Sequence, residues 1–306
     1  METRFELPVD GAALAVREWR PEGRPRATLQ IVHGMSEHAG RYAGVAEAFT
    51  RAGFAVLAHD LRGHGHTRTE HGPGHLGSWR QVLQDVRAVA AEGRRRVTDA
   101  PAFLLAHSMG SFLAQELQLT DPGLARGWIL SGSDGPPSLL ARAGIWIARL
   151  ERLRLGAERP SPLIERLSFG RFNDGFEGRT PFDWLSRDPR EVDAYVADPL
   201  CGRPLSTGSW VELLRALVRI ARSRERSTAP SDLPTYVLGG DQDPVSRKGR
   251  GLRALVTAYR SAGCTDVTLD LVAGARHEVL ADVGHAEVHG RLVAWCDAIV
   301  TRGSTN

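Results

Sequence analysis

The chain reads Leu104-Leu105-Ala106-His107-Ser108-Met109-Gly110-Ser111 at the point where a short apolar run gives way to a helical pattern. The apolar run, residues 102–106, is typical of a parallel strand that is buried on both faces. A serine between small residues at such a junction resembles the G-x-S-x-G pattern, in which a sharp turn exposes a nucleophilic hydroxyl. Ala106 stands where the pattern has its first glycine, and one methyl group is tolerable there. We interpret Ser108 as a candidate nucleophile, with an ordinary buried serine as the alternative.

Short β-rich runs alternate with helical patterns on both sides of this stretch. Such alternation is typical of an α/β fold with a doubly wound, mostly parallel sheet. Strands are predicted at residues 13–19, 28–32, 54–58, 102–106, 127–130, 235–238 and 267–272, and helices at 42–52, 79–94, 111–119, 249–262 and 286–300. The alternation stops after the fifth of these strands. We therefore predict a core of residues 1–131 and 232–306, with residues 132–231 (the insertion) forming a helical cap, or lid.

A nucleophilic serine needs a histidine and an acid, which in this kind of fold follow it in the order serine, acid, histidine on loops after later strands. The strand at 235–238 leads into Gly239-Gly240-Asp241-Gln242-Asp243-Pro244, and the strand at 267–272 leads into a loop with Arg276-His277-Glu278. Both loops supply the required residue at the expected edge of the sheet. His277 is the candidate base, and the loop alone leaves Asp241 and Asp243 open as the acid.

Acyl transfer also requires N–H donors for the oxyanion that develops on the substrate. The backbone N–H of Met109, directly after Ser108, is one candidate. The strand at 28–32 ends in His33-Gly34-Met35, where Gly34 permits a close approach of the backbone. We therefore predict that the N–H groups of Met35 and Met109 form an oxyanion hole.

Two further motifs resemble those of a known family. The run His33-Gly34-Met35-Ser36-Glu37-His38-Ala39-Gly40-Arg41-Tyr42 resembles the HG-x-x-EH-x-x-RY signature of monoacylglycerol lipases and bacterial lysophospholipases. The run Asp60-Leu61-Arg62-Gly63-His64-Gly65-His66-Thr67 resembles their D-x-RG-x-G-x-S loop, with Thr67 in place of the usual serine. These proteins form a branch of the α/β-hydrolase superfamily that is of the serine aminopeptidase S33 type.

This resemblance implies an α/β-hydrolase fold with a catalytic triad of Ser108, Asp243 and His277, since the G-x-x-D pattern of the family, counted from Gly240, selects Asp243. It also implies a serine hydrolase without a cofactor. Its substrate would be a lipid-like ester, namely a monoacylglycerol, a lysophospholipid or a short-chain ester.

Two other functions remain open on the same fold. Related proteins cleave amides, and an aminopeptidase would hold the amine of its substrate with acidic residues of the cap. The candidates for that role are Glu165, Asp174, Glu177 and Asp183. A non-catalytic receptor is disfavoured because it needs no complete triad. Epoxide hydrolases and dehalogenases are disfavoured because they use aspartate where Ser108 stands.

The insertion contains helical patterns at residues 139–155 and 210–222. The apolar face of the first is interrupted by arginines, among them Arg149 and Arg152. Such a helix packs on a core, and it can also contact a lipid surface with its arginines near anionic headgroups. We therefore expect transient, peripheral contact with a membrane. The substrate-binding residues expected in the cap are Leu139, Ile145, Trp146, Phe172 and Trp184.

The composition excludes several classes of protein. The chain has 306 residues and a net charge of +3, and its basic residues are scattered among acids rather than clustered as in nucleic-acid binders. Three widely spaced cysteines, Cys201, Cys264 and Cys296, support neither a disulfide framework nor a structural zinc site. No run resembles a signal peptide or a membrane span. We therefore expect a soluble cytoplasmic protein, and the sequence indicates no oligomeric state.

Five histidines lie close together in the sequence and raise the question of a metal. They are His59, His64, His66, His71 and His75. Imidazoles at such spacing can bind zinc or copper. The resemblance already accounts for the loop around Gly63 without a metal, and no carboxylate-rich group accompanies these histidines. We therefore expect no metal ion.

Overall fold

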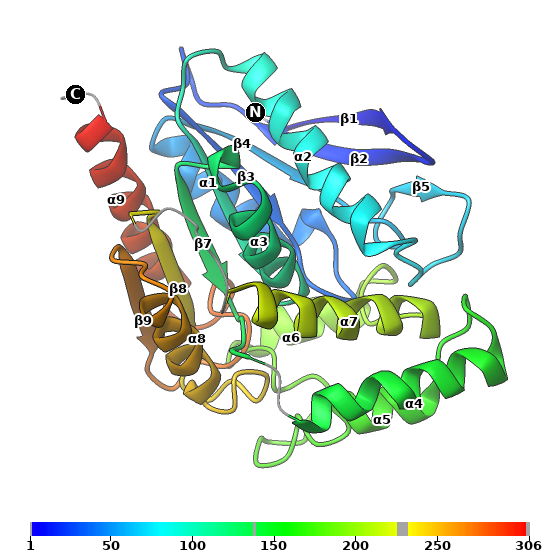
Figure 1. Ribbon diagram of the computed structural model, residues 1–306. Coiled ribbons are helices and arrows are strands. Elements are labelled where there is room, and N and C mark those ends of the chain that lie inside the picture. The colour runs from blue at the N-terminus through cyan, green and yellow to red at the C-terminus, as the bar shows by residue number, and fades with distance from the viewer. Residues whose placement is uncertain (1, 137–138, 225–231, 304–306) are drawn as a thin grey trace.

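The computed structural model describes residues 2–136, 139–224 and 232–303, and it has a central sheet with helices on both faces (Figure 1). The strands are β1 (Glu2–Val9), β2 (Ala12–Trp19), β3 (Ala27–Val32), β4 (Phe54–His59), β5 (Arg68–Thr69), β6 (Ala102–His107), β7 (Gly127–Ser131), β8 (Thr235–Gly240) and β9 (Val267–Val272). Their order across the sheet is β1-β2-β4-β3-β6-β7-β8-β9, and β5 pairs with β2. The strands from β4 to β9 in this order are parallel, whereas β2 is antiparallel to both β1 and β4. The predicted α/β fold with a mostly parallel sheet is confirmed.

The helices of the core lie where the periodicity predicts them. They are α1 (Ala43–Arg51), α2 (Trp79–Arg96), α3 (Met109–Thr120), α8 (Arg250–Ser261) and α9 (His285–Gly303). Helices α1 and α9 pack on one face of the sheet, and α2, α3 and α8 cover the other (Figure 1). The central strands β3, β4, β7 and β8 are buried along their whole length, as expected of parallel strands between two helical layers.

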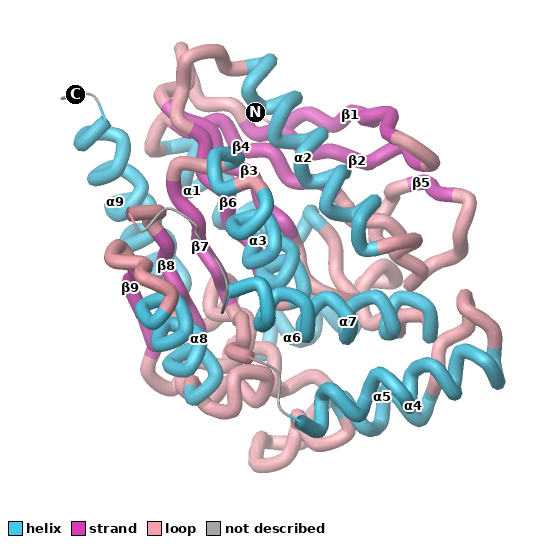
Figure 2. The backbone as a smooth tube through the Cα atoms, in the orientation of Figure 1, coloured by secondary structure: helices cyan, strands magenta, loops and turns pink. Residues whose placement is uncertain are grey.

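The insertion leaves the sheet after β7 and returns at β8. Its described residues form α4 (Leu139–Leu155), α5 (Pro162–Phe169), α6 (Pro189–Ala197) and α7 (Thr207–Arg224). Helix α7 contacts both α3 of the core and α4, so α4 lies on the outer side of α7 (Figure 2). Strands β1 and β5 and helices α5 and α6 were not predicted from the sequence.

Parallel strands place the loops that follow them at one edge of the sheet. The loops after β3, β6, β8 and β9 therefore meet there, and they carry Met35, Ser108, Asp243 and His277. The insertion starts from the end of β7 at the same edge. In the described ranges, no helix has the length and apolar character that crossing a bilayer requires.

Candidate active site

Ser108 lies in a strained turn between β6 and α3. Its backbone has φ +50° and ψ −119°, in a region that non-glycine residues seldom occupy. A Cβ atom on Gly110 would lie 2.5 Å from the carbonyl oxygen of His33, so the turn requires glycine at this position. The predicted strand, turn and helix around Ser108 are thus present, and the turn holds the serine at the wall of a cavity.

His277 is paired with Asp243. The Nδ1 atom of His277 lies 3.1 Å from Oδ1 of Asp243, which is fully buried. Because a carboxylate only accepts hydrogen bonds, the ring proton is on Nδ1, and Nε2 is left with its lone pair. Asp241 instead accepts a hydrogen bond from the N–H of Gly274 at 2.8 Å. The structure therefore brings Asp243, and not Asp241, to the histidine.

The surroundings of His277 favour its charged form. Burial alone would lower the pKa of the imidazole, but the Asp243 carboxylate, assisted by Glu278 and Glu37, raises the pKa above its ordinary value. His277 and Ser108 line the same cavity. An imidazole of raised pKa with a free Nε2 is suited to take a proton from a hydroxyl group and to hold it.

The loop after β3 is oriented by the side chain of His33. The N–H of Leu61 donates to Nε2 of His33 at 2.8 Å, so Nδ1 carries the proton and donates to the carbonyl of Gly34 at 2.7 Å. In a trans peptide the N–H points opposite to the C=O, so the N–H of Met35 points away from His33. A Cβ atom on Gly34 would lie 3.0 Å from Cβ of Ser108, which places this peptide directly beside the serine.

The second predicted donor belongs to the first turn of α3. The N–H groups of a first turn have no carbonyl partner within their own helix. Met109 is the first residue of α3, and Met35, Ser108 and Met109 all line the same cavity. The structure thus gathers the three residues that an acyl-transfer site requires at this point.

A buried ionic network joins the loop after β3 to the loop that carries His277. Oε1 of Glu37 accepts from the N–H of Gly34 at 2.6 Å and from the hydroxyl of Tyr42 at 2.8 Å. Arg41 donates to Glu37 at 3.0 Å and to Oε2 of Glu278 at 2.8 Å. Burial would raise the pKa of Glu37, but Arg41 holds it below its ordinary value. The sequence marked Glu37, Arg41 and Tyr42 as a family signature but gave them no role, and the structure shows that they fix the site.

The cavity in front of Ser108 has a volume of ≈ 550 Å³ and a largely apolar lining. Four aromatic side chains form one wall, the aromatic wall, made of Phe169, Phe172, Trp184 and Trp210. The ring centroid of Trp184 lies 5.2 Å from that of His277, so the wall reaches the candidate base. Phe172 and Trp184 were expected to line the pocket, whereas Phe112, Phe169 and Trp210 were missed because nothing in the sequence indicates which way they face.

Two residues expected in the pocket lie elsewhere. Ile145 lines a separate hollow between α4 and α7, and Trp146 is 65% exposed on the outer side of α4. The physical reason is the position of α7, which lies between α4 and the cavity. The expectation that Ile145 and Trp146 contact the substrate is therefore corrected, and the side chain of Leu139 lies outside the described residues.

Two groups of side chains among the described residues could share a metal ion. One is His38, Asp198 and Cys201, and the other is His71, His75 and Glu158. Of the five histidines that are close in sequence, the second group contains two. His59 and His64 are buried elsewhere, and burial lowers their pKa values to about 3 and about 4.

The fold and the site together define an α/β-hydrolase with a serine at its nucleophile turn. Residues 23–284 match the family described as serine aminopeptidase, S33, and the chain belongs to this family. A monoacylglycerol lipase of Mycolicibacterium smegmatis is 30% identical over 292 residues, which cover 94% of each chain. The phospholipase YtpA of Bacillus subtilis is 38% identical over 201 residues, covering 65% of this chain and 70% of that protein.

Solved structures support the same assignment. A thermostable carboxyl esterase from Bacillus coagulans superimposes with a TM-score of 0.88 at 25% identity, and the match covers 98% of this chain and 99% of the esterase. With these relatives, the chain is a carboxylic ester hydrolase.

Proposed function

We propose that the protein hydrolyses monoacylglycerols and related lipid-like esters through an acyl-enzyme on Ser108. The hydroxyl oxygen of Ser108 attacks the ester carbonyl while Nε2 of His277 takes the hydroxyl proton. Asp243 holds the tautomer of His277 and stabilises the imidazolium. The N–H groups of Met35 and Met109 stabilise the oxyanion, and His277 then gives its proton to the leaving alcohol. Water, activated by the same histidine, releases the carboxylic acid and restores the serine.

The observation that carries this proposal is the pairing of His277 with Asp243 beside a serine in a strained turn. The cavity at this serine supports a lipid-like substrate. An apolar cavity of ≈ 550 Å³ has the size of a typical small-molecule site, and its aromatic wall would contact an acyl chain. The relative from Mycolicibacterium smegmatis is named a monoacylglycerol lipase, which fits such a pocket.

We also propose that residues 132–231 act as a cap over this site. Segments of the insertion contact the catalytic loop directly, since the N–H of Glu278 donates to the carbonyl of Leu185 at 2.8 Å. Arg276 also donates to the carbonyl of Asp183 at 2.6 Å. The cap would then set which acyl chains reach Ser108.

The direct test compares p-nitrophenyl esters from acetyl to palmitoyl with 1- and 2-monoacylglycerols of the same chains. We expect turnover that disappears in Ser108→Ala, with longer chains preferred over acetyl. A fluorophosphonate probe should label the wild type and not this variant. Folded wild-type protein that the probe does not label, and that cleaves no ester of the series, would contradict the proposal.

Amide hydrolysis is the second candidate, because the family is described as serine aminopeptidases. Of the four acidic residues considered for binding an amine, Glu165 lines the cavity, and its Oε1 accepts a hydrogen bond from Trp210 at 3.3 Å. Burial raises the pKa of Glu165, which weakens its attraction for a cation. Glu177 is instead paired with Arg276 at 2.6 Å. Aminoacyl-nitroanilides assayed beside the esters decide the point, and a preference for the anilides would favour the peptidase.

We further propose that the outer side of the cap contacts lipid surfaces. Three side chains of α4 spaced by one or two turns are strongly exposed, namely Trp146 at 65%, Leu150 at 65% and Leu153 at 84%. Leu163 and Leu167 of α5 are exposed as well. Arg149 lies over the ring of Trp146, where it can reach an anionic headgroup.

A further inference from the structure

Three segments that are distant in sequence meet beside β5. They are residues 70–76 of the core, residues 156–161 between α4 and α5, and the start of α7. The N–H of Ser206 donates to the carbonyl of Gly74 at 2.9 Å, and the N–H of Thr207 donates to that of Arg159 at 2.9 Å. His71, His75 and Glu158 lie at this junction with one ligand atom of each within 4.8 Å of the others. The junction joins the core to the insertion, and His71, His75 and Glu158 are not among the residues that line the cavity of Ser108.

The tautomer of His75 follows from its hydrogen bonds. The hydroxyl of Ser209 donates to the carbonyl of Gly74 at 3.0 Å, so the hydroxyl of Ser206 must donate to Ser209 in their 2.9 Å contact. Oγ of Ser206 therefore accepts from Nδ1–H of His75 at 2.7 Å. This leaves Nε2 of the buried His75 unprotonated. A metal-binding histidine characteristically donates its other ring N–H in this way.

His71 and Glu158 complete the group. Nδ1 of His71 lies 2.8 Å from Oε1 of Glu158, and the rings of His71 and His75 are 4.3 Å apart between centroids. In this geometry Nδ1 of His71 carries the ring proton and donates to the Glu158 carboxylate. Nε2 of His71 lies 3.6 Å from Oε1 of Glu70, which can accept the ring proton when Nδ1 binds an ion.

We propose that His71, His75 and Glu158 bind a zinc ion. Two imidazole nitrogens and one carboxylate oxygen are a ligand set that zinc takes, with a water molecule as the fourth ligand. Zinc bonds of about 2.0–2.2 Å require the three donors to close in slightly. The exposed Glu158 side chain can make most of this adjustment. The ion would join residues 70–76 to residues 156–161, and so fasten the insertion to the core.

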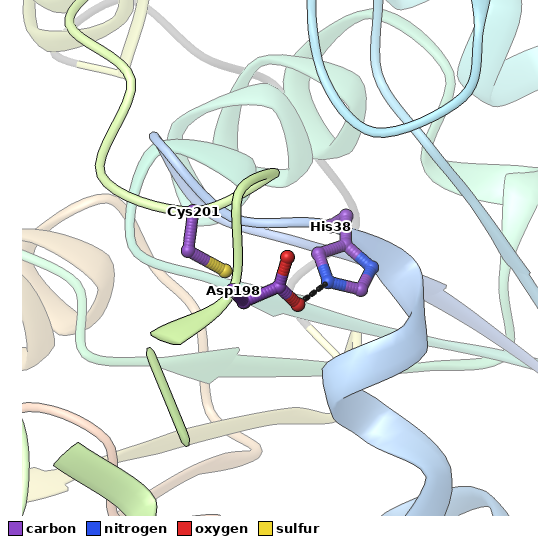
Figure 3. Close-up of side chains that lie close together, drawn as sticks. All are labelled: His38, Asp198 and Cys201. Carbon is purple, nitrogen blue, oxygen red and sulfur yellow. Dashed lines mark hydrogen bonds and ion pairs between the residues drawn. The ribbon is translucent and has the colours of Figure 1, made fainter. Parts of the chain in front are cut away.

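The other group of potential metal ligands, His38, Asp198 and Cys201, has a different hydrogen-bonding pattern (Figure 3). The N–H of Gly40 donates to Nδ1 of His38, so the ring proton is on Nε2, which donates to Asp198 at 2.8 Å. The nitrogen facing the carboxylate is protonated, as it is in His71, but the ring proton of His38 cannot move to Nδ1, because Nδ1 accepts from Gly40, whereas Nε2 of His71 faces Glu70. Burial also raises the pKa of the nearby Cys201 thiol to about 12, which disfavours the thiolate that a metal needs. His38 and Asp198 thus form a hydrogen-bonded pair beside Cys201, and this group serves as the control.

The test is a zinc titration of the full chain without a histidine tag, followed by competition with a chromophoric chelator. We expect one zinc ion per chain and a zinc-dependent rise in Tm, since an ion that binds only the folded state stabilises it. Glu158→Gln and His71→Asn should each abolish the stoichiometric binding. Ser206→Ala should weaken it by about 10–100-fold, because His75 loses the partner that fixes its tautomer.

Two controls keep the result interpretable. Cys201→Ser should bind zinc as the wild type does, and Ser108→Ala should do so as well, which separates this proposal from the proposed esterase. Ester hydrolysis by Glu158→Gln without added zinc should equal that of the wild type, which shows that the variant is folded. Absence of saturable binding to the wild type would overturn the proposal. So would binding that survives in Glu158→Gln, or binding that is lost in Cys201→Ser.

Discussion

Asp243 shows how a single carboxylate sets the chemistry of its neighbour. Its Oδ1 accepts from the N–H of Val245 at 2.9 Å as well as from His277, so both the backbone and the imidazole orient it. Among the described residues, its other oxygen is buried without a protein partner. The carboxylate is thus held in place by the loop and is not free to turn toward solvent.

Asp243→Asn is expected to lower kcat for ester hydrolysis by about 10⁴-fold, because an amide in this position can favour the wrong tautomer of His277. The measurement is steady-state hydrolysis of p-nitrophenyl butyrate. Asp241→Asn is the matched control in the same loop, and we expect it to retain most activity, since Asp241 bonds Gly274 and not the histidine. If instead Asp241→Asn lost activity and Asp243→Asn kept it, the acid would be Asp241.

The raised pKa of His277 predicts the acid side of the pH profile. The imidazole accepts the proton of Ser108 only in its neutral form, so kcat/KM should fall as the pH drops through a pKa above the ordinary 6.5. Because Asp243 contributes to this rise, the residual activity of Asp243→Asn should titrate at lower pH. The profile of kcat/KM reports the free enzyme. This account would be contradicted if the acid limb of the wild-type kcat/KM profile had an apparent pKa at or below 6.5 and Asp243→Asn did not shift it.

At the scale of elements, the site depends on buried ion pairs that connect two loops. Arg41 is buried between Glu37 of the loop after β3 and Glu278 of the loop after β9. Arg41→Met would leave both carboxylates without their cation in the interior, which typically costs about 3–5 kcal/mol. We expect this loss in the free energy of unfolding measured with urea, together with lower kcat, because Met35 and His277 lie on the two loops.

Arg171→Met is the control for this prediction. Arg171 pairs with Asp174 at 3.0 Å, and both side chains are exposed, so this pair should contribute less than about 1 kcal/mol. If the two variants lowered the free energy of unfolding equally, the buried ion pairs of Arg41 would contribute no more to stability than an exposed pair does.

The exposed apolar side of α4 leads to a prediction about membranes. Leu150→Ser and Leu153→Ser should weaken binding to phosphatidylglycerol vesicles, because each leucine buried in the bilayer interface contributes up to about 1.5–3 kcal/mol. Sedimentation with vesicles measures this. Hydrolysis of soluble p-nitrophenyl butyrate should not change, since these residues lie away from the cavity. Leu185→Ser, at the cavity, should lower hydrolysis of p-nitrophenyl butyrate and leave binding to the vesicles unchanged. Unchanged sedimentation of both α4 variants would exclude this surface.

The elements that could be predicted from the sequence are those whose burial leaves a pattern. Strand β6 is apolar from Ala102 to Ala106 because helices cover both faces of the sheet there, and this run is what predicts a buried strand. Helices α5 and α6 are short, at 8 and 9 residues, so each offers only about two turns in which a helical period could be recognised. Strand β1 is largely exposed and rich in charge, so it resembles a loop.

The residues of the site likewise divide into those that the sequence predicts and those that it does not. Ser108, Asp243 and His277 follow strands, and parallel strands bring such residues together whatever the distance between them in sequence. The wall of the cavity instead depends on how the helices of the insertion pack. Helix α4 is apolar around much of its surface, so its sequence does not tell whether Trp146 faces the core or the outside. The sequence therefore predicts the fold, which depends on the order of strands and helices. It does not predict the lining of the pocket, which depends on how the helices pack.

At the scale of the whole molecule, several buried histidines are held in their neutral form. Burial lowers the pKa values of His59 and His107 to about 3 and those of His64 and His289 to about 4. These groups stay neutral in the folded protein while the unfolded chain takes up protons near pH 6.5. Their contribution to stability is therefore complete above pH 6.5 and is lost as the pH falls below it. Asp134, whose pKa burial raises to about 6, takes up a proton in this window and opposes the fall, whereas the carboxylates whose pKa is lowered take up protons only at lower pH.

The free energy of unfolding should therefore fall between pH 6.5 and pH 5, by about 1.4 kcal/mol per pH unit for each such histidine. His277 acts with the opposite sign: its raised pKa adds stability that is complete below pH 6.5 and is lost as the pH rises through the raised pKa, so its contribution stays nearly constant between pH 6.5 and pH 5. The sharpest test is His59→Leu, since both ring nitrogens of His59 lack a protein partner within the described residues. Urea unfolding at several pH values should show a slope reduced by one proton in this variant. A packing difference between the two proteins is already present at pH 8 and does not affect the slope of the free energy of unfolding against pH. An unchanged slope would mean that His59 is not the neutral group that the structure shows.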